Sequence, residues 1–565
     1  MRGYVVEMAR DYFSEYYDEN HDNGIDISKK DVFPLLKYRK DTKRFADKAL
    51  NNIIIPFPGF DSVDFDNRYW GTDKKKKYGD SYQLYMQSMR ICAELLNEYT
   101  ESKVIDYLDK AEEIILSWID YIENGTDEKM VWYDHPTAYR TQVIIQFLYL
   151  AESAGKTIDT KLFRAVLLKH AEILGNDEIY KNNNHGLMMD RSLMILGNVL
   201  KNENLFYKGY YRAIDTFWYS FSYTGIHLEN SPDYHQMVVN MYKEIENYLN
   251  SRDKSLGKNV LGYLDRAELY PNILLKPDRS FPAIGDSGSA KRKVEKVYKN
   301  LYDEEAGIAI IQYSKPKPLY LSFVCGYSSR VHKHKDDLSI NLNYNGVDFF
   351  EDPGKYNYSN SKERKYIVSK EAHSTFYLNQ FDYSIKPENR FDRKVALTGY
   401  EDNKLFTVVQ GKNGDYDGSN AILARKAIVF KSAPLVLLLD NVTTYVKHNL
   451  KFIQNFNLAS NVEVEKTNNI YKLKSKNEEI SIQQFNKIQS DQIIHGNLDT
   501  PIAINTVGFG KAEKTKQIRF ENAAKKGNVY CTAIFDDRKV KNVNIEIENR
   551  MVTVSFNGTS YVIYQ

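Results

Sequence analysis

The fold of this chain is decided around residues 332–344, which read HKHKDDLSINLNY. Apolar and polar side chains alternate from Leu338 to Tyr344, which is the period of a β-strand. If the strand includes the residues before it, His332, His334 and Asp336 point to the same face. Two imidazoles and a carboxylate in that arrangement predict a site for proton transfer or metal binding.

Strand patterns continue from this stretch to the end of the chain. The predicted strands are 308–313, 319–325, 338–344, 405–410, 422–430, 435–440, 450–458, 480–484, 529–535 and 551–563. Turn residues separate them, including Asn345-Gly346 and Asn557-Gly558. Many strands without intervening helices predict stacked antiparallel sheets.

Toward the N-terminus the pattern is helical, from about residue 30 to about 270. The predicted helices include 82–96, 104–122, 143–151, 162–170, 187–200 and 237–249. Successive helix pairs form either an open solenoid or an (α/α) toroid, and the absence of a sequence repeat mildly disfavours a regular solenoid. Prolines and glycines between 275 and 300 end the helical part. We therefore expect a helical domain over 1–290 and an antiparallel β-domain over 291–565.

Composition excludes several classes of protein. The net charge is +2, which argues against a dedicated nucleic-acid binder. The 44 tyrosines suit a carbohydrate cleft, although they are also ordinary core residues. The three cysteines are isolated and predict neither a disulfide framework nor a zinc ribbon.

The sequence also bears on location. The first thirty residues have no apolar run of signal-peptide length, and no stretch approaches the length of a transmembrane helix. We expect a cytoplasmic protein without membrane insertion, or a secreted or periplasmic one if a signal has been trimmed from the sequence.

Two polar motifs interrupt the helical half. Residues 182–186 read Asn-Asn-Asn-His-Gly, so Asn184 and His185 lie at a helix start, where they could bind a carboxylate or simply cap the helix. Residues 229–235 read Glu-Asn-Ser-Pro-Asp-Tyr-His. Tyr234 there could act as general base or acid if positive groups lie nearby, or could be a packing residue.

Further candidates lie in the β-half. Asp352 follows the hairpin turn at Asn345-Gly346 and could face His334, and His373 follows in Ala-His-Ser-Thr. One carboxylate and two imidazoles suit a tetrahedral Zn²⁺, although Asp352 could also belong to a plain turn and His373 to the surface. Gly285-Asp286-Ser287-Gly288 is interpreted as the connection between domains.

Taken in order, these motifs resemble a family. Asn-His-Gly before a helix, Glu-x-Ser-x-x-Tyr-His, His-x-His-x-Asp-x-Leu-Ser, Asp-x-Gly and Ala-His-x-Thr resemble the heparinase II/III-like polysaccharide lyases and the related toroid-plus-sandwich alginate lyases. The resemblance covers 80–400 by motif and the remainder by architecture. Lys333 and Lys335 stand where the family usually has small residues, which makes this segment more basic and could signal a different substrate charge.

The resemblance implies a fold and roles for single residues. The fold would be an N-terminal (α/α) toroid, as an incomplete barrel of helix pairs, followed by a C-terminal antiparallel β-sandwich, with the cleft between them. The implied roles are neutralisation of the substrate carboxylate by Asn184 beside His185, catalysis by Tyr234 and His332, and a structural zinc held by His334, Asp352 and His373. Asp336 has no firm role beyond orienting a histidine, and no organic cofactor is expected.

The expected activity is β-elimination on an acidic polysaccharide or oligosaccharide that contains uronic acid. Neutralising the carboxylate stabilises the enolate that forms when the C5 proton is removed, while an acid protonates the leaving O4. Further substrate-binding candidates are His135, Arg140, Glu229 and Arg330. Arg140 could bind a second uronate through two hydrogen bonds, or could be an exposed or structural arginine.

Three alternatives stay open. A uronyl C5-epimerase uses the same proton abstraction but returns a proton to the opposite face. A non-catalytic glycan-binding protein could retain the scaffold alone. A hydrolase would need a carboxylate pair, for which Glu229 and Asp233 are the candidates, and we give it low weight.

Overall fold

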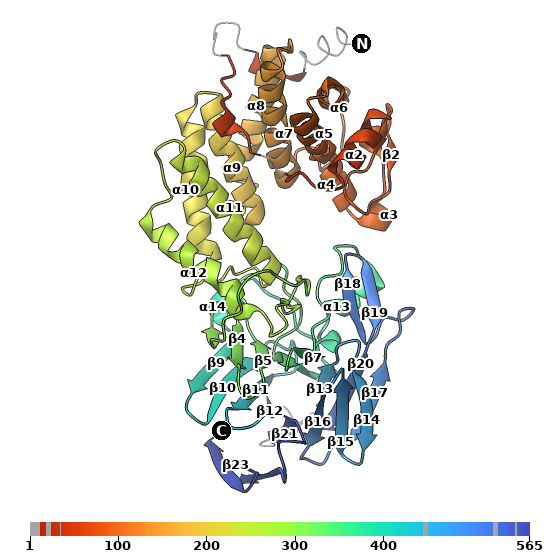
Figure 1. Cartoon of the computed structure of the whole chain (residues 1–565), viewed down its shortest axis with the longest axis vertical. Helices are drawn as coiled ribbons and strands as arrows, with labels where there is room; N and C mark the ends of the chain where they lie inside the picture. The colour runs from red at the N-terminus through yellow and green to blue at the C-terminus, as the bar shows by residue number, and fades with distance from the viewer. Residues whose placement is uncertain are drawn as a thin grey trace. The chain divides into compact units, whose positions relative to one another are not determined.

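The chain folds into two compact units. The computed structural model describes residues 12–17, 24–33, 36–444, 450–523, 529–548 and 551–564. Unit 1 comprises Met1–Ser220 and Asn240–Leu261, and unit 2 comprises Phe221–Val239 and Gly262–Gln565. Helices in the N-terminal part are followed by antiparallel sheets, so the predicted fold class is confirmed (Figure 1). The division differs from a single boundary at residue 290, because the segment around Tyr234 belongs to unit 2.

The helical part contains the predicted helices, although one of them is broken, and it also holds a short two-stranded sheet. Its elements are η1 Ser14–Tyr16, η2 Lys29–Asp31, α2 Thr42–Leu50, β1 Ile53–Ile54, β2 Val63–Asp64, η3 Tyr69–Gly71, α3 Lys75–Tyr78, α4 Ser81–Gln87, α5 Arg90–Ser102, α6 Ile105–Glu123, α7 Asp134–Ser153, α8 Thr160–Gly175, α9 Asn184–Val199, α10 Glu203–Ser220, α11 Pro232–Asn250 and α12 Lys258–Leu274. The helix predicted over 82–96 is broken into α4 and α5, because Met89 adopts a left-handed conformation with φ of 52°.

The helices of unit 1 pack in two layers. α5 packs on α7 and α7 on α9, while α6, α8 and α10 each pack against the helix that precedes them. α7 and α9 are buried along most of their length, whereas α10 exposes Tyr207, Tyr211 and Trp218. Within the described part of the chain, no helix is both long enough and apolar enough to cross a bilayer.

Unit 2 carries most of the strands. Its elements beyond α12 are β3 Leu301–Asp303, β4 Ile308–Tyr313, β5 Leu319–Val324, β6 Ser339–Tyr344, β7 Val347–Phe350, α13 Lys362–Ile367, η4 Lys370–Ala372, β8 Phe376–Leu378, α14 Asn389–Asp392, β9 Val395–Asp402, β10 Phe406–Asn413, β11 Ala421–Phe430, β12 Leu435–Thr444, β13 Lys451–Asn457, β14 Glu463–Thr467, β15 Ile470–Ser475, β16 Glu478–Gln484, β17 Ser490–His495, β18 Ile504–Gly508, β19 Lys511–Lys514, β20 Lys516–Ala523, β21 Val529–Phe535, β22 Asn544–Glu548, β23 Met551–Phe556 and β24 Thr559–Tyr564.

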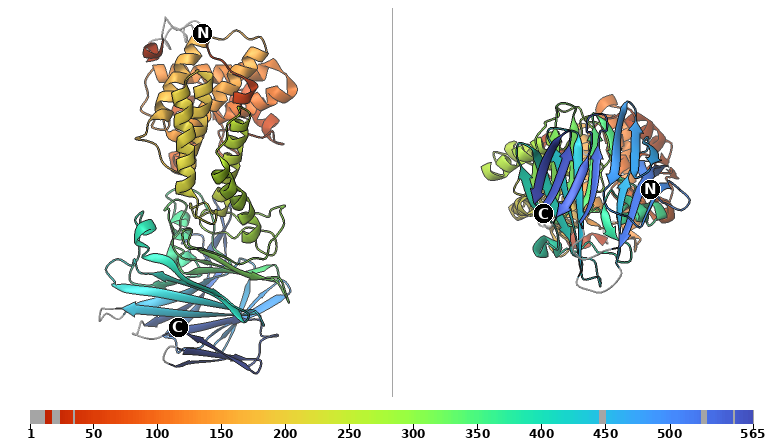
Figure 2. Two further views of the ribbon diagram at one scale, coloured as in Figure 1. Left: turned by 90° about the vertical axis from the view of Figure 1, so that its left-hand side faces the viewer. Right: turned by 90° about the horizontal axis from the view of Figure 1, so that it is seen from below.

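The strands of unit 2 stack as layers (Figure 2). The central sheet has the order β14-β15-β16-β21-β12-β11-β10-β9. One of its faces packs on the sheets β3-β4-β5-β6-β7 and β17-β20-β13-β8, with Leu342, Leu438 and Phe452 in a shared core. The other face packs on β22-β23-β24 through Leu437 and Val554. The predicted sandwich therefore has a third, smaller layer.

Candidate functional site

The histidine-rich segment before β6 is a loop and not part of a strand. β6 begins at Ser339, and both His332 and Leu338 have left-handed backbones, with φ of 58° and 66°. His332, His334 and Asp336 are therefore not on a strand, and the prediction that strand geometry places them on one face is wrong. The alternating stretch that follows does form β6 as predicted.

Tyr234 and His332 lie in contact. Tyr234 is in the first turn of α11, and its ring stacks on the imidazole of His332 with centroids 3.5 Å apart and an interplanar angle of 21°. The hydroxyl of Tyr234 is 2.7 Å from that of Tyr358 and accepts a hydrogen bond from the Lys355 ammonium at 3.3 Å. Two residues that the sequence analysis did not select, Lys355 and Tyr358, thus contact the predicted catalytic tyrosine.

Asp286 is the centre of the site, although its Gly-Asp-Ser-Gly motif was interpreted as a connection between domains. Its carboxylate lies 3.2 Å from Nδ1 of His332 and 3.0 Å from Nε2 of His334. Arg364 donates to both carboxylate oxygens, with Nη2 at 3.1 Å. Burial raises the pKa of Asp286, but the hydrogen bonds from His332 and His334 outweigh it and hold the pKa well below its usual range.

The contact with Asp286 fixes the orientation of His332. A carboxylate only accepts hydrogen bonds, so Nδ1 of His332 carries the proton and Nε2 of the neutral ring is free to accept one. Nε2 lies 3.7 Å from Oε2 of Glu229, which is buried. Burial lowers the pKa of His332, although its hydrogen bond to Asp286 opposes the shift. Carboxylates on both sides of the ring would stabilise the imidazolium formed when His332 takes a proton.

Three distant segments meet at Gly285 to form this arrangement. Gly285 has φ of 53°, and a Cβ there would lie 2.5 Å from the carbonyl oxygen of Asn230 and 2.6 Å from that of His332. The side chain of Asn230 in turn donates to the carbonyl oxygens of Ser329 and Val331, at 2.7 and 2.9 Å. Glycine is needed here for both its conformation and its lack of a side chain.

The lysine in the histidine motif does not make the surface more basic. Lys333 is buried, pairs with Asp336, and lies 3.1 Å from Asp337. Asp336 therefore neutralises Lys333, while Asp286 takes the histidine-orienting role expected of Asp336. Lys335 pairs with Asp382 at the surface.

The three predicted metal ligands are neighbours, but they do not form a complete site. Oδ1 of Asp352 is 2.9 Å from Nδ1 of His373, and the rings of His334 and His373 are 5.5 Å apart. Nδ1 of His334 and Nε2 of His373 are buried, and neither has a hydrogen-bond partner among the residues that the structure describes. Among the described residues, no group of three His, Cys, Asp or Glu side chains converges as a metal site would require. The donor types suit zinc, but binding it would replace the His373–Asp352 hydrogen bond.

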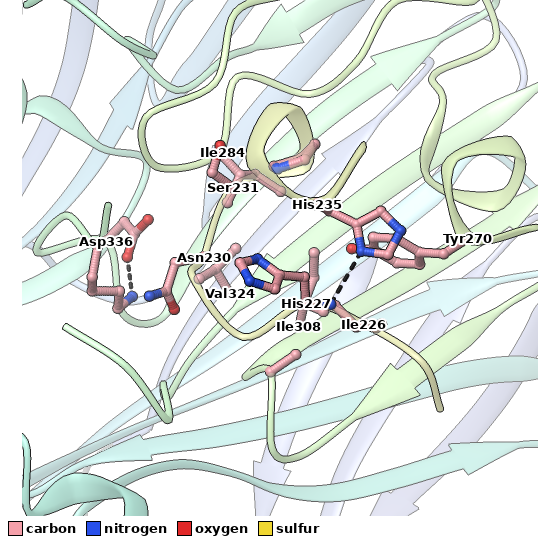
Figure 3. A pocket seen from close by; sticks show the side chains of 13 residues that line it. Ile226, His227, Asn230, Ser231, His235, Tyr270, Ile284, Ile308, Val324 and Asp336 are labelled. Carbon is pink, nitrogen blue, oxygen red and sulfur yellow. Dashed lines mark hydrogen bonds and ion pairs between the residues drawn. The ribbon is translucent and has the colours of Figure 1, made fainter. Parts of the chain in front are cut away.

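A small cavity lies beneath the segment that leads to Tyr234 (Figure 3). Its volume is about 30 Å³, enough for one water molecule. Beside it, both ring nitrogens of His227 and Oδ2 of Asp336 are buried and have no hydrogen-bond partner in the described part of the chain. Nδ1 of His235 accepts from the backbone N–H of His227. Burial lowers the pKa of His227 well below its usual value, so this ring is neutral. The cavity is too small for a sugar.

In unit 1, the predicted residues Asn184 and His185 begin α9. The helix is capped by Asn183, whose side chain accepts from the backbone N–H of His185 and of Gly186. Asn184 is buried, and Nδ1 of His185 is 3.0 Å from Oδ1 of Asp134. Asp134 therefore orients His185 as Asp286 orients His332, and the sequence analysis did not select it.

His135 lies against His185, with ring centroids 5.4 Å apart. Burial lowers the pKa of His135 from 6.5 to about 3, and the proximity of His185 adds to the shift. The folded chain thus keeps this ring neutral at pH values where the unfolded chain protonates it. His135 contributes stability above pH 6.5 that is lost as the pH falls toward 3.

We expect this loss to appear in the pH dependence of unfolding. Between pH 7 and pH 5, the free energy of unfolding should fall about 1–2 kcal/mol further in the wild type than in His135→Gln. Urea unfolding at both pH values measures the difference. Equal losses in the two proteins would contradict a neutral, partly buried His135.

Arg140 does not have the surroundings of a substrate-binding residue. It is fully buried in α7, and its guanidinium donates to Nε2 of His170 at 2.9 Å and to the carbonyl oxygens of Gln87 and Val131. It also stacks on Trp118 at 4.0 Å. The structure corrects the prediction of a uronate-binding role, because every face of this side chain is occupied. Arg330 is exposed in the loop between β5 and β6, and its role stays a prediction.

Comparisons with known proteins agree with this architecture. A family model described as Heparinase II/III N-terminus matches residues 4–308, and one described as Heparinase II/III-like, C-terminal matches residues 303–541. A crystal structure of heparinase III has a TM-score of 0.75 at 16% identity and covers 98% of this chain and 95% of its own. Heparan sulfate lyase HepC from Pedobacter heparinus has a TM-score of 0.65 at 16% identity, with 99% and 94% covered.

A chondroitin AC lyase from Streptomyces coelicolor A3 shares the fold more distantly, with a TM-score of 0.54 at 9% identity over 99% of this chain and 88% of its own. A search among curated proteins found no match. Because the two family models together span most of its residues, the chain belongs to the heparinase II/III-like family, whose fold is that of polysaccharide lyases.

Proposed function

We propose that this protein is a lyase that cleaves an acidic, uronate-containing polysaccharide or oligosaccharide by β-elimination. The observation that carries the proposal is the contact of Tyr234 with Lys355 and His332. An ammonium 3.3 Å from the hydroxyl of Tyr234 would stabilise a phenolate there. A tyrosine with such a neighbour can take a proton from carbon and return it to an oxygen.

The chemistry balances with these groups alone. A base removes the C5 proton, the C4–O4 bond breaks, a C4=C5 double bond forms, and an acid protonates O4. Tyr234 would serve as both base and acid when both transfers occur on one face of the sugar. Nε2 of His332, which Asp286 keeps free of a proton, would take the C5 proton on the other face.

The role of unit 1 is also a proposal. Asn184 would hydrogen-bond the substrate carboxylate, and His185 would assist as a proton acceptor or donor. The pairing of His185 with Asp134 supports this proposal, because it fixes Nδ1 and leaves Nε2 for a ligand. Donors to the carboxylate would stabilise the enolate as an oxyanion hole does.

Incubation with a panel of uronate polymers tests the proposal. Heparan sulfate, chondroitin sulfate and alginate should be followed by ultraviolet absorbance, with solvent deuterium as a second readout. A lyase produces the absorbance of the unsaturated uronate. Deuterium entering C5 without new absorbance would instead identify a C5-epimerase, and neither signal on any polymer would overturn both activities.

We further propose that His334, Asp352 and His373 bind a structural zinc ion. Two imidazoles and a carboxylate are a suitable donor set, and unpartnered, buried nitrogens on both rings support the proposal. Zinc would supply fixed geometry to the segment that carries His332, two residues before His334. Asp286 orients His332 without the metal, because its carboxylate contacts both His332 and His334.

Metal analysis should find about one zinc per chain in protein purified without metal-affinity chromatography. His373→Ala should reduce that content at least tenfold, whereas His495→Ala, at an exposed histidine on β17, should leave it unchanged. A chelator should lower the thermal unfolding midpoint of the wild type and not that of His373→Ala. Protein without any bound metal, including after incubation with zinc, would contradict the proposal.

A further inference from the structure

A second and larger cavity of unit 2 lies beside the candidate site. Its volume is about 380 Å³, and Lys355, whose ammonium contacts Tyr234, is part of its wall. Another part of the wall is the hairpin of β18 and β19, with Val507 and Phe509. The cavity is thus continuous with the group that contacts the proposed catalytic hydroxyl.

Hydrogen bonds fix this hairpin to the segment that carries Lys355. The backbone N–H of Thr506 donates to the carbonyl oxygen of Pro353 at 2.9 Å, and its hydroxyl donates to the same oxygen at 2.6 Å. The N–H of Gly510 donates to the carbonyl oxygen of Tyr356 at 2.8 Å. Because Lys355 lies between these two anchors, the hairpin is held against the backbone of the segment that carries this side chain.

The tip of the hairpin exposes apolar side chains to the cavity. Val507 is 58% exposed and Phe509 is 50% exposed, and both line a cavity whose wall also carries polar groups such as Ser289 and Lys355. An aromatic ring offers a flat apolar face, which suits the C–H face of a sugar ring. The two side chains gain burial only if a ligand enters.

Among the described residues that line the cavity, Lys355 is the one cationic side chain. Its three carboxylates have partners: Asp233 pairs with Arg292 at 2.6 Å, Glu351 lies 3.4 Å from Lys276, and Asp352 contacts His373. Across the residues that the structure describes, no carboxylate lies within ion-pair distance of Lys355. The cavity therefore combines an apolar platform with an ammonium that contacts the hydroxyl of Tyr234 and can also bind an anionic group.

We propose that Phe509, Val507 and Lys355 form a saccharide subsite, which binds the sugar that adjoins the uronate processed at Tyr234. Phe509 stacks on that sugar, and Lys355 binds a carboxylate or sulfate of the glycan. This subsite rests on the proposed function, because it assigns the occupant by its position beside Tyr234.

The substitution Phe509→Ala tests the subsite. With oligosaccharides long enough to fill it, KM should rise about tenfold while kcat changes less than about twofold, because stacking energy is lost without change to the reacting groups. Phe509→Trp, which retains a stacking ring, should keep the wild-type KM. The control Phe391→Ala removes a ring that is 82% exposed on α14, outside the cavity, and should have no effect.

Binding measurements separate the subsite from the proposed activity. Calorimetry should use uronate oligosaccharides with Tyr234→Phe, alone and combined with Phe509→Ala. Turnover by the wild type with equal affinity in both variants would overturn the subsite and leave the lyase proposal intact. Binding weakened about tenfold by Phe509→Ala without any turnover would support the subsite and overturn the lyase. A fall in kcat without a change in KM would overturn the subsite, as would the absence of any binding.

Discussion

Replacing Tyr234 by phenylalanine will lower kcat on the cognate polymer by about 10³-fold, while the protein keeps its fold. The substitution removes only the hydroxyl that contacts Lys355 and Tyr358, and the ring can still stack on His332. General acid–base catalysis by one side chain contributes about 10²–10⁴-fold in rate. Initial rates of unsaturated-uronate formation measure the loss, and circular dichroism verifies the fold.

Two other tyrosines provide controls for this substitution. Tyr211→Phe removes the hydroxyl of a tyrosine that is 60% exposed on α10, and the rate should not change. Tyr358→Phe should lower kcat only about tenfold, because its hydroxyl supports that of Tyr234 at 2.7 Å. A Tyr234→Phe protein with more than a tenth of the wild-type kcat would show that another group transfers the proton. If Tyr358→Phe lost more kcat than Tyr234→Phe, Tyr358 would be the catalytic tyrosine and Tyr234 the supporting one.

Replacing Arg425 by alanine will have the largest effect on stability, about 3–5 kcal/mol. The guanidinium of Arg425 binds both oxygens of Asp440 at 2.7 and 2.8 Å, and neither side chain is exposed. It also donates to the carbonyl oxygens of Leu338 and Ser374, which follow the histidine loop and His373. Alanine would leave a buried carboxylate and two buried carbonyls without this partner.

Chemical unfolding of unit 2 measures this loss. The urea midpoint should fall markedly in Arg425→Ala, and the double variant Arg425→Met/Asp440→Leu should recover most of it, because no unpaired charge remains. The surface pair Lys431–Asp402, about one third exposed at each partner, is the control, and Lys431→Ala should cost less than about 1 kcal/mol. Equal losses of stability in Arg425→Ala and Lys431→Ala would show that burial of the Arg425–Asp440 pair does not set the size of the effect.

The fold could be predicted from local patterns wherever one face of an element is buried. The alternation in β23, where Val552, Val554 and Phe556 are buried, and the helical spacing in α8 both carry that signal. It fails for β14, whose residues Glu463–Thr467 are almost all exposed, so nothing but its neighbour β15 marks it as a strand. It also fails at Met89, because a left-handed residue inside an apolar repeat leaves no mark in the pattern.

The site could be predicted only in part, for a different reason. Tyr234 and His332 belong to motifs, and the structure does bring them into contact. Asp286 and Lys355 were missed because their roles depend on partners 46 and 121 positions away, which no local spacing reveals. Arg140 was assigned to substrate binding because the sequence does not distinguish a buried arginine that donates to backbone carbonyls from one that binds an anion.

The meeting of three segments at Gly285 has a consequence for how the protein can be divided and for how it folds. Glu229, Tyr234 and Asp286 all precede residue 290, yet they belong to unit 2. A fragment that starts at 291 would keep the sheets and lose these side chains of the candidate site. During folding, backbone contacts between residues 230, 285 and 332 close loops of many tens of residues, whose entropy must be offset by packing that is already formed. The candidate site should therefore assemble after the sheets around it.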